Sequence, residues 1–237
     1  MPLSEGDPVK RQVAAHWNRR AAGFDNDFGH SIRIQGERAA WDRVLDVVIE
    51  GRSGLDVLDA GCGTGFLAFE FQSRGHHVIG VDFAREMIEQ ARQKAVALQA
   101  DVRFEEGDAE NLPFDARSFD IVVSRHVLWT LPHPEAAIEE WIRVLRPGGR
   151  LAVIDGHFAE RSTPGTDEYA EIAGRLPFMG GRQRGEIEAL LRAHGLVDVR
   201  SDPFVDLIAA QEQRMRDEGR EVRSHERYAV WGDVPRQ

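Results

Sequence analysis

The sequence predicts an α/β fold in which a sheet of mainly parallel strands is covered by helices. An apolar run at residues 55–58 leads into a loop with three glycines and then into an amphipathic segment at residues 66–74. This order indicates a strand, a loop and a helix. Residues 119–123 form another apolar run, as expected of a parallel strand that is covered on both faces. Strand and helix patterns continue to alternate as far as residue 155, which supports the α/β class.

The composition indicates one substantial hydrophobic core. The chain has 237 residues, of which 42% are hydrophobic, and a formal net charge of -10. This negative charge disfavours a general electrostatic grip on nucleic acid. No apolar run approaches the roughly 20 residues that span a bilayer, and residues 1–10 lack the apolar core of a signal peptide. Cys62 is the one cysteine, so an internal disulfide is excluded and a thiolate zinc site is disfavoured. We therefore expect a cytoplasmic protein with no metal, nucleic-acid or membrane partner.

The remaining elements follow from hydrophobic periodicity and from breaks in it. Strands are expected at residues 55–58, 77–81, 102–105, 119–123, 151–154, 196–200 and 225–231. Helices are expected at residues 8–22, 35–50, 66–74, 84–99, 134–145, 186–193 and 206–218. The helix at residues 206–218 is highly charged, and we interpret it as a surface helix with a solvated face. Residues 159–185 are less regular, with a polar loop at residues 161–167 and a short helix at residues 169–176.

Glycines at positions 61, 63 and 65 indicate a loop that lies close to a ligand. Glycine has no Cβ, so the backbone turns tightly and a ligand can approach it. The helix that follows presents free N–H groups to whatever lies over the loop. A dinucleotide fingerprint would place its third glycine where this chain has Phe66. The loop also lacks the Lys-Ser/Thr pair of a phosphate-binding P-loop. A tight turn without a ligand is the alternative interpretation.

Residues 59–65, Asp-Ala-Gly-Cys-Gly-Thr-Gly, resemble motif I of the class I S-adenosylmethionine-dependent methyltransferases. The Arg-Pro-Gly-Gly-Arg turn at residues 146–150 also resembles a feature of that family. The resemblance implies a doubly wound, Rossmann-like sheet of seven strands, mostly parallel with an antiparallel last strand, with helices on both faces. It implies a single methyltransferase domain over residues 1–237. Its parts would be an N-terminal helical lid at residues 1–50, a cofactor-binding core at residues 51–155, and an acceptor-side insert with sheet completion at residues 156–237.

The resemblance further implies that S-adenosylmethionine is the cofactor and S-adenosylhomocysteine the product. Asp82 lies about 20 residues past the loop, where an acid binds the two ribose hydroxyls, although capping of the next helix is an alternative. Asp108 matches an acid that meets the adenine amino group, with an Asx turn as the alternative. The expected cofactor-binding residues are Asp59, Gly61, Cys62, Gly63, Thr64, Gly65, Asp82, Phe83, Met87, Asp108, Ala109 and Ser124.

His126 is the predicted catalytic residue. It follows the strand at residues 119–123, and ligands of open parallel sheets lie beyond the carboxyl ends of the strands. A histidine can accept a proton near neutral pH, or it can only position a neighbour. Asp155 follows another strand and points to the same edge of the sheet. The residues expected to contact the acceptor, for each of which core or loop packing is the alternative, are Trp17, Phe24, Trp129, His157 and Phe178.

The expected reaction is an in-line displacement at the sulfonium methyl by a nucleophile of a small-molecule acceptor. The enzyme needs to align the two reacting atoms about 3–3.5 Å apart. Residues 124–127 do not match the Asn/Asp-Pro-Pro-Tyr/Phe pattern of many enzymes that methylate nucleobase or glutamine nitrogens. The alternatives are an RNA or protein acceptor, a nicotinamide-dependent oxidoreductase, and a non-catalytic module that binds the cofactor. The sequence leaves open whether the protein is a monomer or a homodimer.

Overall fold

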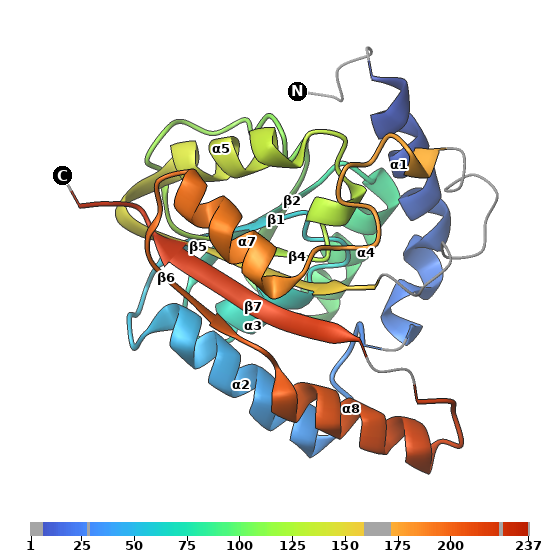
Figure 1. Ribbon diagram of the computed structural model, residues 1–237. Coiled ribbons are helices and arrows are strands. Elements are labelled where there is room, and N and C mark those ends of the chain that lie inside the picture. Colours follow the sequence, from blue (N-terminus) through green and yellow to red (C-terminus); the bar gives the residue numbers. More distant parts are fainter. Residues whose placement is uncertain (1–6, 28, 159–171, 223–224, 237) are drawn as a thin grey trace.

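A seven-stranded sheet forms the centre of the protein (Figure 1). The computed structural model describes residues 7–27, 29–158, 172–222 and 225–236. The strand order is β3-β2-β1-β4-β5-β7-β6. Its strands are β1 (Asp56–Ala60), β2 (His77–Asp82), β3 (Val102–Glu106), β4 (Phe119–Arg125), β5 (Leu145–His157), β6 (Val197–Asp202) and β7 (Glu226–Asp233). Neighbours from β3 to β5 pair in parallel, whereas β7 is antiparallel to both β5 and β6. The predicted sheet with an antiparallel last strand is confirmed.

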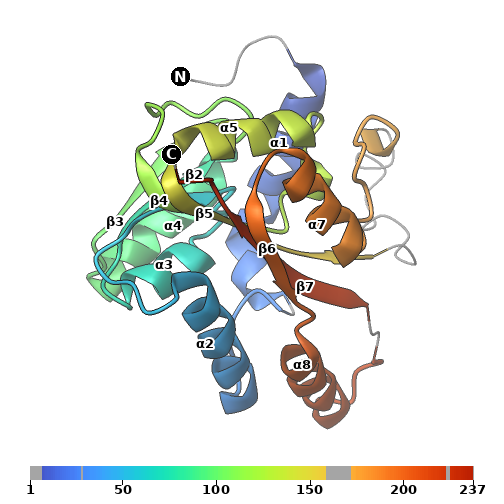
Figure 2. The same cartoon turned by 60° about the vertical axis from the view of Figure 1, so that its left-hand side comes forward.

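Helices cover both faces of this sheet (Figure 2). One face is covered by α2 (Gln35–Ile49), α3 (Phe66–Gln72), α4 (Arg85–Leu98) and α8 (Val205–Asp217), and the other by α5 (Pro134–Val144) and α7 (Arg184–Ala193). Further helical elements of the described ranges are α1 (Pro8–Arg20) and two 3₁₀ helices, η1 (Ala21–Asn26) and η2 (Leu128–Thr130). Within the described ranges, no helix is both long enough and apolar enough to cross a membrane.

The apolar strands divide their side chains between the two faces. Val57 and Ile121 belong to the cluster beneath α2 and α3, whereas Leu58 and Val122 belong to the cluster beneath α5 and α7. All four side chains are fully buried. Successive residues of a strand point to opposite faces, so a strand buried on both faces needs apolar residues at consecutive positions. This requirement explains the unbroken apolar runs in the sequence.

The turn predicted at residues 146–150 lies inside β5, which begins at Leu145. Leu145 pairs with Phe119, and the pairing resumes only at Arg150 opposite Ile121. The intervening residues form an irregularity in which Gly148 has a left-handed backbone and donates a hydrogen bond to the Val234 carbonyl (2.9 Å). The predicted end of the helix near residue 145 is therefore correct, but the strand begins at Leu145 and not at Leu151 as predicted.

α8 is a surface helix with a solvated face, as predicted, but its inner face buries polar and charged side chains. Arg214 of α8 forms an ion pair with Glu37 of α2 (2.9 Å), and the Glu37 side chain is only 1% exposed. Gln211, one turn earlier on α8, is also buried. Figure 1 shows α2 and α8 lying side by side below the sheet. Charge in the sequence did not reveal this pair, because its two members are held together only by the tertiary fold.

The less regular segment before α7 is described only in part. The predicted polar loop at residues 161–167 and the start of the predicted helix at residues 169–176 lie outside the described residues. In the described part, Ile172 and Leu176 are buried against Val9 and Val13 of α1. This segment therefore packs on the N-terminal helix.

Replacing Gly61 by alanine should destabilise the fold more than the same change at Gly75. Both glycines have a left-handed backbone, with φ of 75° and 83°, which costs an alanine roughly 1–2 kcal/mol. A Cβ on Gly61 would lie 2.2 Å from a methyl group of Val127, whereas a Cβ on Gly75 would meet nothing within 4 Å. Overpacking adds about 1–3 kcal/mol. Urea unfolding of Gly61→Ala and Gly75→Ala without ligand measures the difference, and equal losses would contradict the packing described for Gly61.

Candidate functional site

A cavity of about 490 Å³ lies next to the glycine loop, at the carboxyl ends of the parallel strands. Its volume falls within the ~300–1,000 Å³ that is typical of small-molecule sites. Most of the site residues predicted from the sequence line this cavity: Trp17, Phe24, Asp59, Gly61, Cys62, Gly63, Thr64, Asp82, Phe83, Met87, His126 and Trp129. The fold therefore brings the expected cofactor loop and the expected catalytic histidine to one cavity.

Hydrogen bonds fasten the glycine loop to the end of β2. The N–H groups of Gly61 and Cys62 both donate to the Val81 carbonyl, at 2.8 and 3.0 Å. The N–H of Gly63 donates to Oδ2 of Asp82 at 2.9 Å. These bonds hold the loop and the Asp82 carboxylate in a fixed relation at the wall of the cavity.

Asp82 keeps acceptor capacity beyond these structural bonds. Its Oδ1 accepts a hydrogen bond from the Ala84 N–H (2.8 Å), so the carboxylate also holds the turn into α4. A carboxylate offers about four acceptor sites, which backbone donors from Gly63, Phe83 and Ala84 do not exhaust. Burial raises the pKa of Asp82 to about 6. The geometry accommodates the structural role together with a ligand role.

Asp108 is not among the described residues that line the cavity. Its Oδ2 accepts a hydrogen bond from Nζ of Lys10 (2.6 Å), and its Oδ1 accepts one from the Glu110 N–H (2.9 Å). The second bond is the Asx turn that the sequence left open. An adenine would have to share Asp108 with Lys10, so the adenine role stays a prediction.

Three more predicted cofactor residues are not among the described residues that line the cavity: Gly65, Ala109 and Ser124. Ala109 and Ser124 instead make structural contacts. The Ser124 hydroxyl donates to the Ala60 carbonyl at 2.9 Å. The Ala109 carbonyl accepts from the indole N–H of Trp141 at 3.0 Å. Their cofactor roles remain predictions.

Two residues expected on the acceptor side, His157 and Phe178, likewise lie apart from the described lining. The backbone of His157 forms a bridge with Gly181. The Phe178 ring lies beneath the guanidinium of Arg182, 4.6 Å away. Both contacts are of the kind that the packing interpretation predicts, and neither tests a contact with an acceptor.

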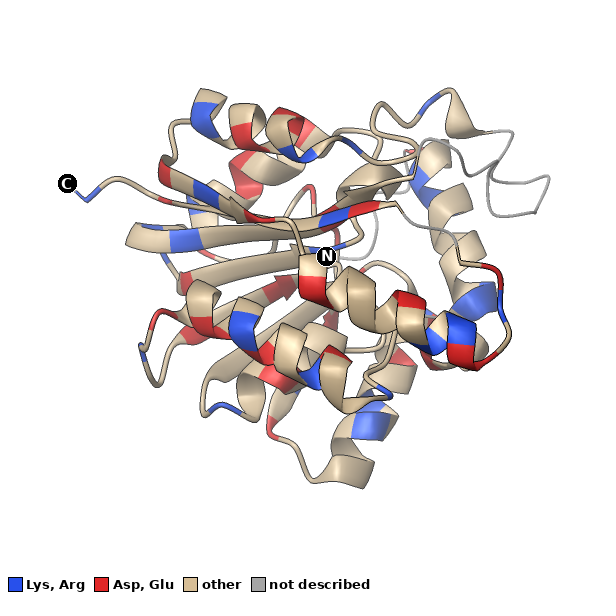
Figure 3. Ribbon diagram, turned by 60° about the horizontal axis from the view of Figure 1, so that its bottom comes forward, with Lys and Arg blue, Asp and Glu red and all other residues tan. Residues whose placement is uncertain are grey.

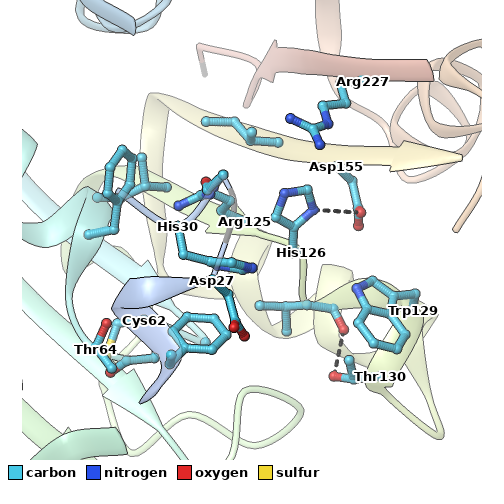
Figure 4. Close-up of a pocket in the computed structure, with 18 of the residues that line it drawn as sticks. Asp27, His30, Cys62, Thr64, Arg125, His126, Trp129, Thr130, Asp155 and Arg227 are labelled. Carbon is cyan, nitrogen blue, oxygen red and sulfur yellow. Dashed lines mark hydrogen bonds and ion pairs between the residues drawn. The ribbon is translucent and has the colours of Figure 1, made fainter. Parts of the chain in front are cut away.

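His126 is held beside a buried carboxylate. Its Nδ1 lies 3.4 Å from Oδ1 of Asp155 (Figure 4). Asp155 is 3% exposed, and burial raises its pKa to about 7. The backbone of His126 is left-handed, with φ of 58°. Such strain costs roughly 1–3 kcal/mol outside glycine and concentrates at functional sites. This geometry favours a functional role for His126 over plain packing.

Sequence reasoning missed six basic residues that line the cavity, among them His30, Arg125 and Arg227. Arg125 ends β4 and immediately precedes His126, so its position beyond a parallel strand was an available signal. Arg227 lies on β7, opposite Gly156 of β5. Its position depends on the antiparallel return of the last strand, for which the sequence around it carries no local signal.

The described cavity also holds carboxylates that are unusually hard to ionise. Burial, together with the neighbouring Asp82 carboxylate, raises the pKa of Asp59 to about 7. Burial lowers the pKa of the Arg125 guanidinium to about 10, and the nearby positive charge of Arg227 acts in the same direction. Strongly shifted pKa values in a cavity are typical of functional sites.

Comparison with known proteins places the chain among methyltransferases. The family model described as a methyltransferase domain matches residues 58–153. A demethylmenaquinone methyltransferase of Thermus thermophilus is 37% identical over 149 residues, which are 62% of this chain and 67% of that protein. A malonyl-[acyl-carrier protein] O-methyltransferase of Pectobacterium atrosepticum is 36% identical over 155 residues, or 64% of this chain and 57% of that protein. The matches thus span only part of these relatives.

A solved structure shows the same fold over a longer range. Haemonchus contortus phosphoethanolamine N-methyltransferase 2, in complex with phosphomonomethylethanolamine and S-adenosylhomocysteine, matches with a TM-score of 0.72 at 17% identity. The match covers 100% of this chain and 61% of that chain. The family model, the Thermus relative and the glycine loop joined to Asp82 agree with one another. The chain therefore belongs to the class I S-adenosylmethionine-dependent methyltransferase family.

Proposed function

We propose that the protein transfers the methyl group of S-adenosylmethionine to a small-molecule acceptor. The observation that carries this proposal is a single cavity of about 490 Å³, bordered by the glycine loop and Asp82 and also by His126. The names of relatives agree with it, since one is a methyltransferase of demethylmenaquinone. Another relative is a malonyl-[acyl-carrier protein] O-methyltransferase, so the class of acceptor is the part that needs a direct test.

The residues around the glycine loop fit the adenosyl and methionine parts of the cofactor. The backbone at Gly63 is open toward the cavity, because a Cβ there would come no closer than 3.8 Å to the nearest side chain, Phe24. Asp82 offers acceptor oxygens for ribose hydroxyls. Phe83 and Met87 supply apolar surface beside it. We assign these four residues to cofactor binding, with Asp82 as the one whose chemistry is most specific.

The N-terminal segment covers this part of the cavity. Trp17 of α1 makes edge-on ring contacts with Trp129, 6.0 Å between centroids, and with Phe24 of η1, 5.9 Å. Asp25 of η1 accepts a hydrogen bond from the Thr64 hydroxyl (2.5 Å) and pairs with Lys94 of α4 (2.8 Å). These contacts tie η1 to the glycine loop, as expected of the helical lid at residues 1–50.

Once bound, S-adenosylmethionine supplies a methyl group on a positively charged sulfur, which is already activated for displacement. The task of the protein is to align the acceptor and to exclude water. The aromatic cover of Trp17, Phe24 and Trp129 serves the exclusion of water. A base is needed only where the nucleophile of the acceptor carries a proton at the working pH.

His126 is the group best placed to take such a proton. Its Nδ1 faces Asp155, and the tautomer that donates from Nδ1 leaves Nε2 as the proton acceptor. Asp155 then acts as a positioning residue that fixes the ring and stabilises the imidazolium. This arrangement needs no further residue for the proton transfer.

Changing Asp82 to asparagine should weaken binding of S-adenosylhomocysteine at least tenfold, or roughly 1.4 kcal/mol, because an amide nitrogen replaces one acceptor oxygen. Calorimetry measures the affinity. Asp56→Asn is the control, since Asp56 is the first residue of β1 and lies at the end of the strand away from the glycine loop. In the same samples, methyl-labelled S-adenosylmethionine should label a small-molecule extract, and Asp82→Asn should label it less. Label found instead in added RNA or protein would contradict the proposed acceptor class.

Cofactor affinity should also weaken as the pH falls through about 6. Burial raises the pKa of Asp82 to about 6, so below that pH the carboxyl is mostly protonated and accepts hydrogen bonds less well. Above it, the carboxylate is ionised and binding reaches its plateau. Calorimetry with S-adenosylhomocysteine between pH 5 and 8 should show this loss in the wild type and a flatter profile in Asp82→Asn. The same pH profile in both proteins would show that the loss of affinity does not come from protonation of Asp82.

Replacing His126 by glutamine should slow labelled methyl transfer by about 10²–10⁴-fold when the acceptor loses a proton, which is the usual contribution of a general base. Affinity for S-adenosylhomocysteine should stay within about twofold, because His126 is assigned to the acceptor. Asp155→Asn should give a smaller loss with a shifted pH profile, as expected of a positioning residue. Transfer at the wild-type rate in His126→Gln would remove the proposed base.

A further inference from the structure

One end of the cavity is lined by basic side chains. Arg125, Arg227, His30 and His126, here called the basic end, lie away from Cys62 and Thr64 of the glycine loop (Figure 4). This grouping contrasts with the rest of the protein, whose net charge is -10. Acidic and basic residues are interspersed along the elements in view in Figure 3. The basic end is therefore a local feature of the cavity.

Arg125 is the central residue of the basic end. Its guanidinium carbon lies 4.4 Å from the centre of the Phe66 ring and 5.2 Å from that of Trp41. One terminal nitrogen donates a hydrogen bond to the Gly29 carbonyl. Its Nε is buried and has no hydrogen-bond partner among the residues that the structure describes. Leaving a buried charged donor without an acceptor is unfavourable by several kcal/mol at most sites, which points to a ligand as the missing acceptor.

No ion pair compensates this charge within the described residues. The carboxylates that influence Arg125 are those of Asp59 and Asp155, and neither lies within 4.0 Å of its guanidinium. Burial raises the pKa of both carboxyls to about 7. At neutral pH, each is therefore less fully ionised than an exposed carboxyl, so the two carboxyls compensate the charge of Arg125 only in part.

Arg227 adds a second guanidinium at the same place. Its Nε donates to Nε2 of His225 (2.8 Å), and a terminal nitrogen bonds to Gln211. These contacts orient the side chain toward Gly29, where a Cβ would lie 3.7 Å from it. Burial lowers the pKa of His30 to about 2, and the charges of Arg125 and Arg227 act in the same direction. Two guanidinium groups that line the same cavity repel each other, and an anion between them would offset this repulsion.

We propose that Arg125 and Arg227 bind an anionic group of the acceptor, a carboxylate or a phosphate, whose apolar body packs on the aromatic lining. This inference rests on the proposed function, because it names the class of acceptor that the same cavity takes. Arginine suits the role, since its planar fork matches the oxygens of carboxylates and phosphates. The aromatic side chains that line the cavity include Trp41, Phe66, Phe158 and Phe204.

The test compares simple anions with neutral molecules that carry the same phenyl ring. Calorimetry measures binding of benzoate, phenyl phosphate, benzamide and benzyl alcohol to the wild type, with and without saturating S-adenosylhomocysteine. We expect benzoate or phenyl phosphate to bind at least tenfold more tightly than the neutral compounds. The anion that binds more tightly shows whether the site prefers a carboxylate or a phosphate. Equal affinity for benzoate and benzamide, and for phenyl phosphate and benzyl alcohol, would overturn the proposal without any variant.

Arg125→Met removes the charge and keeps the length of the side chain. We expect it to lose at least tenfold in anion affinity while its affinity for S-adenosylhomocysteine stays within twofold. Arg227→Met should show the same selective loss, which keeps the test available if Arg125→Met does not fold. Arg103→Met is the control, because Arg103 is 70% exposed on β3 and does not line the cavity.

The other outcomes are also decisive. Full anion affinity in folded Arg125→Met and Arg227→Met would overturn the proposal. Loss of S-adenosylhomocysteine affinity alone in Arg125→Met would assign the guanidinium to the cofactor and overturn it as well. Failure of the wild type to bind S-adenosylmethionine or S-adenosylhomocysteine would instead refute the proposed function. In that case, the calorimetric measurements made without S-adenosylhomocysteine still decide whether Arg125 and Arg227 bind an anion.

Discussion

The site depends on the hydrogen bonds that join the glycine loop to the end of β2. The Val81 carbonyl accepts from two loop N–H groups, and the Asp82 carboxylate accepts from a third, at Gly63. These bonds turn the chain sharply away from the sheet, so that the space beyond the strands stays open. Because β1, β2, β4 and β5 end at this same edge, each of them delivers the residues that follow it to the one cavity. A parallel sheet thus converts distant sequence positions into neighbours.

Electrostatics divides this cavity into two regions. Near the glycine loop lie Asp59 and Asp82, and at the other end lie Arg125 and Arg227. Burial makes the charged form of each of these carboxyls costly and raises its pKa. A cationic methyl donor and an anionic acceptor would each meet compensating charge. The proposed methyl transfer and the proposed anion site are in this sense complementary, although either can be tested without the other.

Local patterns in the sequence were sufficient for the sheet and for the residues of the glycine loop that border the cavity. The glycines and Asp82 lie within about one strand–helix–strand unit, and the structure joins them through the hydrogen bond from Gly63 to Asp82. The buried pair of Glu37 and Arg214 was not predictable, since its members are 177 positions apart. Lys10, which donates a hydrogen bond to Asp108, is 98 positions away from it in the sequence. Such contacts depend on the packing of helices, which hydrophobic periodicity does not specify.

Ligand-dependent thermal unfolding tests the central assignment most directly. S-adenosylmethionine, S-adenosylhomocysteine, NAD and NADP would each be added in large excess. A ligand at about a hundred times its dissociation constant adds about 2.7 kcal/mol, which for a domain of this size raises the midpoint by roughly 5–11 °C. The account predicts this rise with the first two ligands and none with NAD or NADP. A rise with NAD or NADP alone would contradict it, and would make the glycine loop part of a nicotinamide-dependent oxidoreductase.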